Sequence, residues 1–145
     1  MPVLDQVLEQ YPTQVKIVFK NFPIRTHRFA IQAAKAALAA ESQGKFWQFH
    51  DLLFKNYNAL NDQKIQEIVL ELGLDEEKFG QQLKNPQIMA KIQKDMNDAS
   101  NAGVQGTPTV FINGKRLRNR TLPGFQAILN KELKKLSKTG GLKAQ

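Results

Sequence analysis

The chain has 145 residues, a formal net charge of +8, and 41% hydrophobic and 23% charged residues, which is ordinary for one folded domain. It contains no cysteine, which excludes disulfides, thiolate nucleophiles and cysteine-ligated metal sites built from these residues. No apolar run approaches the ~20 residues of a membrane-spanning helix, and the first residues lack the pattern of a secretion signal.

Residues 2–10 form the first predicted helix, because Pro2 suits a first helical position and the apolar residues fall on one face. The Tyr11–Pro12 pair ends this helix, since a residue before proline avoids the helical region. The β-branched run at residues 15–20 then predicts a buried strand, which ends at the Asn21–Phe22–Pro23 turn.

Helical periodicity replaces the strand pattern after this turn and continues to about Gly103. Thr26 is a candidate N-cap for an alanine-rich helix that ends near Gly44. Four further helices are predicted: an aromatic-rich one at residues 46–54, one capped by Asn61 or Asp62, one that starts at Asp75 and one opened by Pro86.

The strand period returns at residues 108–112 and again at 115–117. Asn113–Gly114 between these runs predicts a β-hairpin, because both central residues of a type I′ turn need positive φ. Pro123 begins the last predicted helix. Residues 138–145 are rich in lysine and glycine and are expected to form a disordered basic tail.

The segment GVQGTPTVFING at residues 103–114 resembles the cis-proline loop and following hairpin of the DsbA-like branch of the thioredoxin fold. Three further blocks match that family in the same order: residues 15–23 (VKIVFKNFP), 44–54 (GKFWQFHDLLF) and 122–136. The resemblance covers residues 2–137 and implies an α/β, thioredoxin-like fold. It assigns residues 1–25 and 103–137 to the thioredoxin-like part and residues 26–102 to an inserted helical subdomain.

The family's reaction is thiol–disulfide exchange at a Cys-x-x-Cys pair, which in relatives lies just upstream of the stretch matching Pro2 to Tyr11. The chain begins inside that helix, so the resemblance implies an N-terminally truncated member that lacks the first β-strand and the Cys-x-x-Cys motif. Because exchange passes through a sulfur–sulfur mixed disulfide, we expect this chain to be redox-inactive, with no catalytic residue, cofactor or metal. Substrate binding is expected at Gly106, Thr107 and Pro108, with a cis bond before Pro108.

The missing strand also predicts a partner for the chain. In the family it lies between the strands matching 15–20 and 108–112, and unpaired strand edges recruit other chains. We therefore expect a homodimer through the unfilled strand position. The alternatives are direct pairing of the two strands, or a fragment of a longer product. Complete relatives are exported to the periplasm, whereas this chain as given predicts a cytoplasmic protein.

Two other function classes stay open. One is a redox-inactive peptide-binding or chaperone-like module, and the other is a relative of the kappa-type glutathione transferases and isomerases. His27 and His50 are interpreted as capping or packing residues, and Phe46, Trp47 and Phe49 as core. Residues 104–145 hold nine Lys/Arg and one Asp/Glu. We interpret this basic end as a solvated helix face with a tail, without a nucleic-acid or membrane partner, since no aromatic residues interleave with the charges.

Overall fold

The computed structural model describes residues 1–140 of the chain, which divide into two compact units. Residues 1–19 and the chain from 107 onward form one, here called the hairpin unit, and residues 20–106 form the helical unit. The hairpin unit holds α1 (Pro2–Gln10), β1 (Val110–Ile112), β2 (Lys115–Leu117) and α7 (Leu122–Gly140). The helical unit holds α2 (Ala30–Glu41), α3 (Phe46–Lys55), the 3₁₀ helix η1 (Tyr57–Ala59), α4 (Asp62–Glu71), α5 (Glu76–Leu83) and α6 (Pro86–Asn101).

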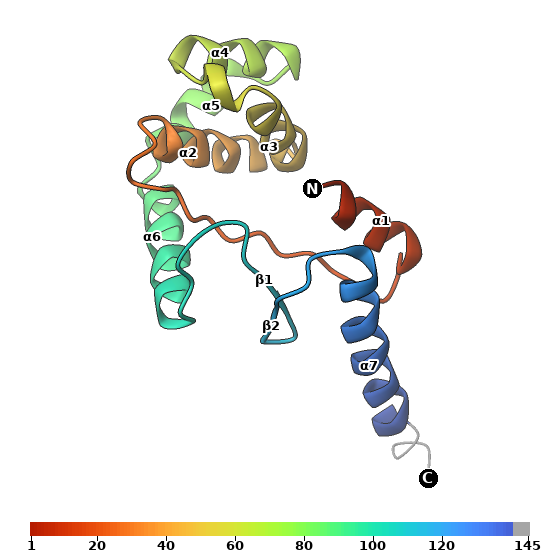
Figure 1. Cartoon of the computed structure of the whole chain (residues 1–145). Coiled ribbons are helices and arrows are strands. Elements are labelled where there is room, and N and C mark those ends of the chain that lie inside the picture. The colour runs from red at the N-terminus through yellow and green to blue at the C-terminus, as the bar shows by residue number, and fades with distance from the viewer. Residues whose placement is uncertain (141–145) are drawn as a thin grey trace. The chain divides into compact units, whose positions relative to one another are not determined.

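The helical unit is built around the alanine-rich helix α2, as Figure 1 shows. Small side chains along α2 let neighbouring helices approach closely, and residues 36–40 are all buried. Phe49 of α3 and Phe79 of α5 stack in this core with ring centroids 5.7 Å apart. The apolar periodicity that predicted these helices therefore marks the faces that meet in the core.

Asn61 and Asp75, two residues expected at helix starts, act as side-chain caps. Asn61 Oδ1 accepts a hydrogen bond from the Lys64 N–H at 2.7 Å, and Asp75 Oδ1 accepts one from the Lys78 N–H at 3.0 Å. The expected cap at Thr26 is wrong, because α2 begins only at Ala30. Residues 24–30 instead form successive tight turns, closed by hydrogen bonds from His27 N–H to Ile24 and from Ala30 N–H to His27.

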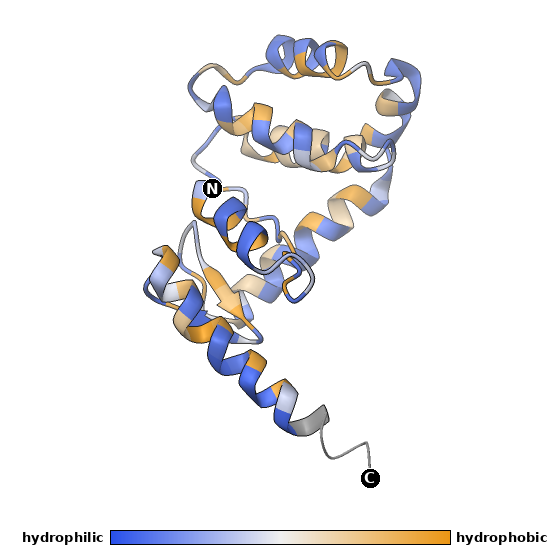
Figure 2. Ribbon diagram, turned by 90° about the vertical axis from the view of Figure 1, so that its right-hand side faces the viewer, coloured by the Kyte–Doolittle hydropathy of each residue, from blue (hydrophilic) through white to orange (hydrophobic). Residues whose placement is uncertain are grey.

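The hairpin unit contains an antiparallel pair in which Val110 faces Leu117 and Ile112 faces Lys115. Asn113 and Gly114 have φ values of 47° and 76°, so they form the left-handed turn that the Asn–Gly pair predicted. Figure 2 shows β1 as an apolar segment next to helices of mixed hydropathy. Helices α1 and α7 pack with this hairpin around a core of four buried side chains, namely Val7, Leu117, Phe125 and Leu129.

The predicted strand at residues 15–20 is wrong for the described chain. Val15 and Ile17 are half-buried and Val18 is 67% exposed, so the burial alternates as in a strand. A strand also needs a hydrogen-bonded neighbour, and the sheet of residues 1–140 contains β1 and β2 alone. Within residues 1–140 the sheet does not include 15–20 as a strand beside 108–112, and the homodimer stays a prediction.

The C-terminal end differs from the expected tail. Helix α7 continues to Gly140, three residues beyond the expected boundary at 137, with Lys138 in a last turn where a cation complements the helix dipole. The rest of the expected tail, residues 141–145, lies outside the described residues. Within the part of the chain that the structure describes, no helix has both the length and the apolar character needed to cross a membrane.

A buried carboxylate ties the start of the helical unit to α6. Asp95 is 1% exposed, and its Oδ2 accepts hydrogen bonds from the backbone N–H and the side-chain Nδ2 of Asn21, at 3.0 and 2.8 Å. Lys20 Nζ lies 3.3 Å from Oδ1. Burial raises the pKa of Asp95, but the hydrogen bonds from Asn21 and Lys20 outweigh it, so the pKa lies below the ordinary value of 3.8.

Replacing this carboxylate tests its contribution to stability. Asp95→Ala leaves two buried donors of Asn21 without an acceptor, so we expect a loss of about 1–3 kcal/mol in the free energy of unfolding, measured by urea denaturation. The stabilisation is present above the ordinary carboxyl pKa and is lost as the pH falls through the lower pKa of the folded state. Asp98→Ala, at an exposed carboxylate on the same helix, is the control and should cost much less. Equal losses for both variants would contradict this account.

Candidate functional site

The predicted substrate loop stands at the entrance to β1. Thr107 and Pro108 are exposed where the chain re-enters the hairpin unit, and the peptide bond between them is cis. Gly106, the last residue of the helical unit, is half-buried. Two residues further on, Val110 packs against the hairpin core. The chain thus presents exposed backbone at residues 107–108 immediately before a segment fixed by packing.

A turn at the start of α7 reaches back to this loop. The Arg120 guanidinium donates a hydrogen bond from Nη1 to the carbonyl oxygen of Pro108. The preceding residue, Asn119, accepts hydrogen bonds at its Oδ1 from the Thr121 N–H at 3.1 Å and the Thr121 hydroxyl at 2.7 Å. Thr121 Oγ1 accepts the Gly124 N–H at 3.4 Å, as a helix N-cap does. The cap of α7 therefore fixes the backbone from which Arg120 contacts the loop.

Gly124 is required by the close approach of this turn. A Cβ atom at position 124 would lie 2.1 Å from the Asn119 carbonyl oxygen, far inside the contact distance. That oxygen belongs to the backbone, so relief of the clash would need movement of the capping turn itself.

A pair of glycine substitutions tests this packing. We expect Gly124→Ala to lower the free energy of unfolding by about 1–3 kcal/mol, because the methyl group displaces the turn. Gly80→Ala is the matched control within α5, where the added Cβ meets nothing within 4 Å. The control should gain about 0.5–1 kcal/mol from helix propensity. Urea denaturation of both variants measures the difference, and a neutral Gly124→Ala would refute the required close approach.

Glu132 joins the hairpin turn to α7. Its Oε1 lies 2.8 Å from the Nζ atoms of both Lys115 and Lys135, and Asn113 Nδ2 donates to its Oε2 at 3.4 Å. The hydrogen bonds from Lys115 and Lys135 lower the pKa of Glu132 to about 2. This carboxylate therefore stays charged over nearly the whole pH range in which the protein is handled.

The Glu132 pKa is directly measurable. An NMR titration of the side-chain carboxyl should give a midpoint near 2, and in Lys115→Gln the midpoint should move up toward the ordinary 4.5. The support that Glu132 gives the hairpin is present above pH 4.5 and is lost as the pH falls through 2. A wild-type midpoint near 4.5 would contradict the ion pairs.

The two histidines are not brought into a catalytic arrangement. His27 is exposed in the turns before α2. The His50 ring packs 4.6 Å from the Phe54 ring, and its Nδ1 lies 3.0 Å from Asp51 Oδ1. Among residues 1–140 the structure has no cluster of three or more His, Cys, Asp or Glu side chains that suits a metal ion. The interpretation of His50 as a packing residue therefore agrees with its surroundings.

The aromatic residues of α3 differ in part from the expected core cluster. Phe49 is fully buried and Phe46 is half-buried, but Trp47 is 46% exposed. Successive helical positions point 100° apart, so a run of neighbouring aromatics does not share one buried face. The Trp47 ring meets the edge of the Phe46 ring at 5.2 Å.

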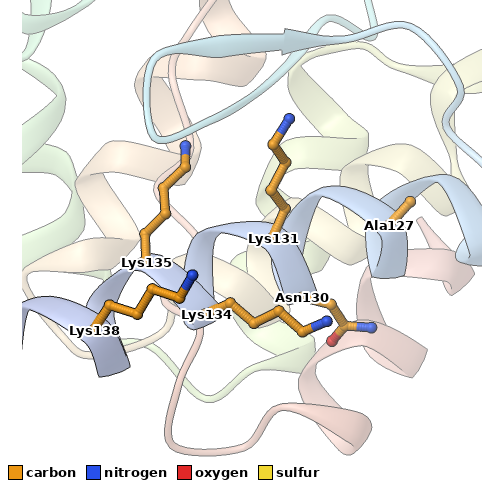
Figure 3. A pocket seen from close by; sticks show the side chains of 6 residues that line it. All are labelled: Ala127, Asn130, Lys131, Lys134, Lys135 and Lys138. Carbon is orange, nitrogen blue, oxygen red and sulfur yellow. The ribbon is translucent and has the colours of Figure 1, made fainter.

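A shallow, open depression of about 370 Å³ lies along α7. Figure 3 shows its lining side chains, which project from one stretch of the helix. The residues lining it are Ala127, Asn130, Lys131, Lys134, Lys135 and Lys138. Its four lysines fit the expected solvated basic face.

Comparison with known protein families shows to which family the chain belongs. A family profile described as Thioredoxin matches residues 2–131. The chain belongs to the thioredoxin family. Its fold is the thioredoxin-like fold expected from the sequence, and the similarity to solved structures below agrees with this assignment.

Two solved structures are similar to this thioredoxin-family chain over most of its length. A thioredoxin-like oxidoreductase from Silicibacter pomeroyi has a TM-score of 0.71 at 25% identity and covers 92% of this chain and 81% of its own. The thiol-disulfide exchange protein alpha-DsbA2 from Wolbachia pipientis has a TM-score of 0.79 at 24% identity, with coverage of 90% and 71%. The second likeness establishes the fold alone.

Curated relatives of the thioredoxin-family chain are larger proteins. Na⁺/H⁺ antiporter NhaA 3 of Salinispora tropica is 35% identical over 116 residues, and Na⁺/H⁺ antiporter NhaA of Herminiimonas arsenicoxydans is 32% identical over 114. Each alignment covers 79% of this chain and 18% of the antiporter. The chain thus spans about a fifth of the length of these relatives.

Sequence reasoning missed Arg120 as part of the candidate site in this thioredoxin-family chain. The Asn119, Thr121 and Gly124 spacing is a helix-start signal and was available from the sequence. The hydrogen bond from Arg120 to Pro108 spans 12 positions and depends on how the hairpin folds back, so no local pattern marks it.

Proposed function

We propose that this chain is a redox-inactive member of the thioredoxin family that binds extended polypeptide at the Thr107–Pro108 loop. The observation that carries the proposal is the family match over residues 2–131 in a chain that contains no cysteine. The family fold supplies the frame for substrate binding, while the atoms for redox chemistry are missing from these 145 residues.

The lack of sulfur limits the chemistry. Thiol–disulfide exchange begins when a thiolate attacks a disulfide sulfur, forming a new S–S bond and releasing the other sulfur as a thiolate. Serine and threonine hydroxyls of this chain cannot form that bond and then give it up to a second thiol. We therefore assign no electron transfer to residues of this chain.

Binding of an extended segment needs only backbone groups in the right place. Peptides that add to a strand or loop edge gain affinity from main-chain hydrogen bonds, which are independent of sequence. The exposure of Thr107 and Pro108, at the entrance to a packed strand, supports this mode. Arg120 supports it further, because its hydrogen bond to the Pro108 carbonyl links the loop to the start of α7.

The activity of the antiporter relatives and the self-association of the chain both bear on this proposal. The antiporter relatives are named for sodium–proton exchange, but the match covers 18% of each of them, so that activity is not assigned to this chain. Self-association through residues 15–20 and β1 remains our proposal for a partner, and the 67% exposed apolar side chain of Val18 supports it.

An activity assay and a binding assay test the proposal together. In the insulin-reduction assay with dithiothreitol, the chain should give the rate of buffer alone. A fluorescein-labelled, S-alkylated insulin B chain should nevertheless bind, as seen by fluorescence anisotropy. Thr107→Trp should weaken binding about tenfold or more by covering the loop, whereas Thr13→Trp, at an exposed turn of the same unit, should leave it unchanged.

Two results would overturn this function. Insulin reduction above the buffer rate would show that sulfur is not needed, and equal binding by the wild type and Thr107→Trp would remove the peptide site from the loop.

A further inference from the structure

Arg120 places a positive charge on the loop proposed to bind peptide. Its guanidinium carries five N–H donors in a planar fork, and the bond to the Pro108 carbonyl uses one of them. The side chain is exposed, so an incoming group can reach the fork from solvent. A fork of this geometry pairs best with a carboxylate, through two parallel hydrogen bonds.

Few acidic residues that could pair with Arg120 lie near it in the sequence. Residues 107–140 contain eight Lys/Arg and one acidic residue, Glu132. Glu132 is held by Lys115 and Lys135, each at 2.8 Å. A carboxylate that satisfies Arg120 therefore has to come from another part of the protein or from a bound molecule, and a ligand docked along residues 107–108 is next to it.

Arg120 is also held in place before any ligand arrives. Asn119 and Thr121 on either side are fixed by the capping hydrogen bonds of α7, and Gly124 allows the turn to close. A cation that is already positioned loses less side-chain entropy on binding than a free surface lysine does. Lys115 and Lys135 of the same unit instead form ion pairs with Glu132.

The surrounding field favours the same class of ligand. Arg116 and Arg118 are exposed on and after β2, and they add to the positive potential of residues 107–140. Such a field speeds the approach of acidic chains and slows basic ones. Nucleic acid would share the attraction, but the contact of Arg120 with a backbone carbonyl at the peptide loop favours a polypeptide whose carboxylate lies beside its bound backbone.

We propose that Arg120 makes the Thr107–Pro108 loop selective for extended polypeptide segments that carry an Asp or Glu side chain. The inference rests on the proposed function, since it names the class of peptide that the same loop binds. Arg120 is a specificity residue here: its guanidinium contacts the ligand carboxylate and, through Pro108, positions the loop.

The test compares two labelled nine-residue peptides that are identical except for a central Glu or Gln. The wild type should bind the Glu peptide about tenfold more tightly, and the ratio of the two Kd values should shrink with added salt. Arg120→Gln should reduce the ratio to about one, and Arg120→Lys should keep part of the preference. Arg118→Gln, which removes an equal charge two residues away, is the matched control and should retain the ratio.

The ratio of Kd values separates the two proposals. If neither peptide binds, the proposed function fails and the selectivity falls with it. If both bind equally to the wild type, the loop is a peptide site but the role of Arg120 is wrong. A preference that survives in Arg120→Gln and disappears in Arg118→Gln overturns the assignment to Arg120. Stronger competition by a single-stranded oligonucleotide than by the Glu peptide overturns the polypeptide as ligand.

Discussion

The candidate site depends on one small hydrophobic cluster. Val7, Leu117, Phe125 and Leu129 are the buried side chains that hold α1, the hairpin and α7 together. Burial of a side chain of this size stabilises the folded state by about 1.5–3 kcal/mol, so four of them leave little reserve. The polar links of Glu132 to Lys115 and of Arg120 to Pro108 join the same elements from outside the core. Loss of this cluster would release the loop and the capping turn of α7 together.

This chain has the fold of its family but not the cysteines on which the family's redox chemistry depends. The thioredoxin match spans residues 2–131 of a chain that contains no cysteine. Redox exchange rests on sulfur, for which no other residue type substitutes. The loop of this chain exposes Thr107 and Pro108 to solvent, and we propose that neighbouring charge sets its selectivity. Arg120 is the charge in contact with it.

Local signals predicted most of the helices and the hairpin turn. Asn61, Asp75 and Asn113–Gly114 act through bonds or dihedral angles within three or four residues, so the sequence shows them directly. The strand at 15–20 failed because a strand is defined by a neighbour that can lie anywhere in the chain. The Asn21–Asp95 contact spans 74 positions, and Arg120–Pro108 needs the hairpin to close first. Hydrophobic periodicity carries no information about such contacts. The sequence contains all the residues involved but does not indicate which of them pair.

The central claim is that the Thr107–Pro108 loop receives an extended polypeptide along its backbone. Amide hydrogen exchange of the intact chain, measured with and without saturating Glu-containing peptide, tests this residue by residue. The account predicts slower exchange at Thr107, Thr109 and Val110 and unchanged exchange in α2 to α5. Slower exchange confined to the aromatic face of α3, or none at all along the loop, would contradict it.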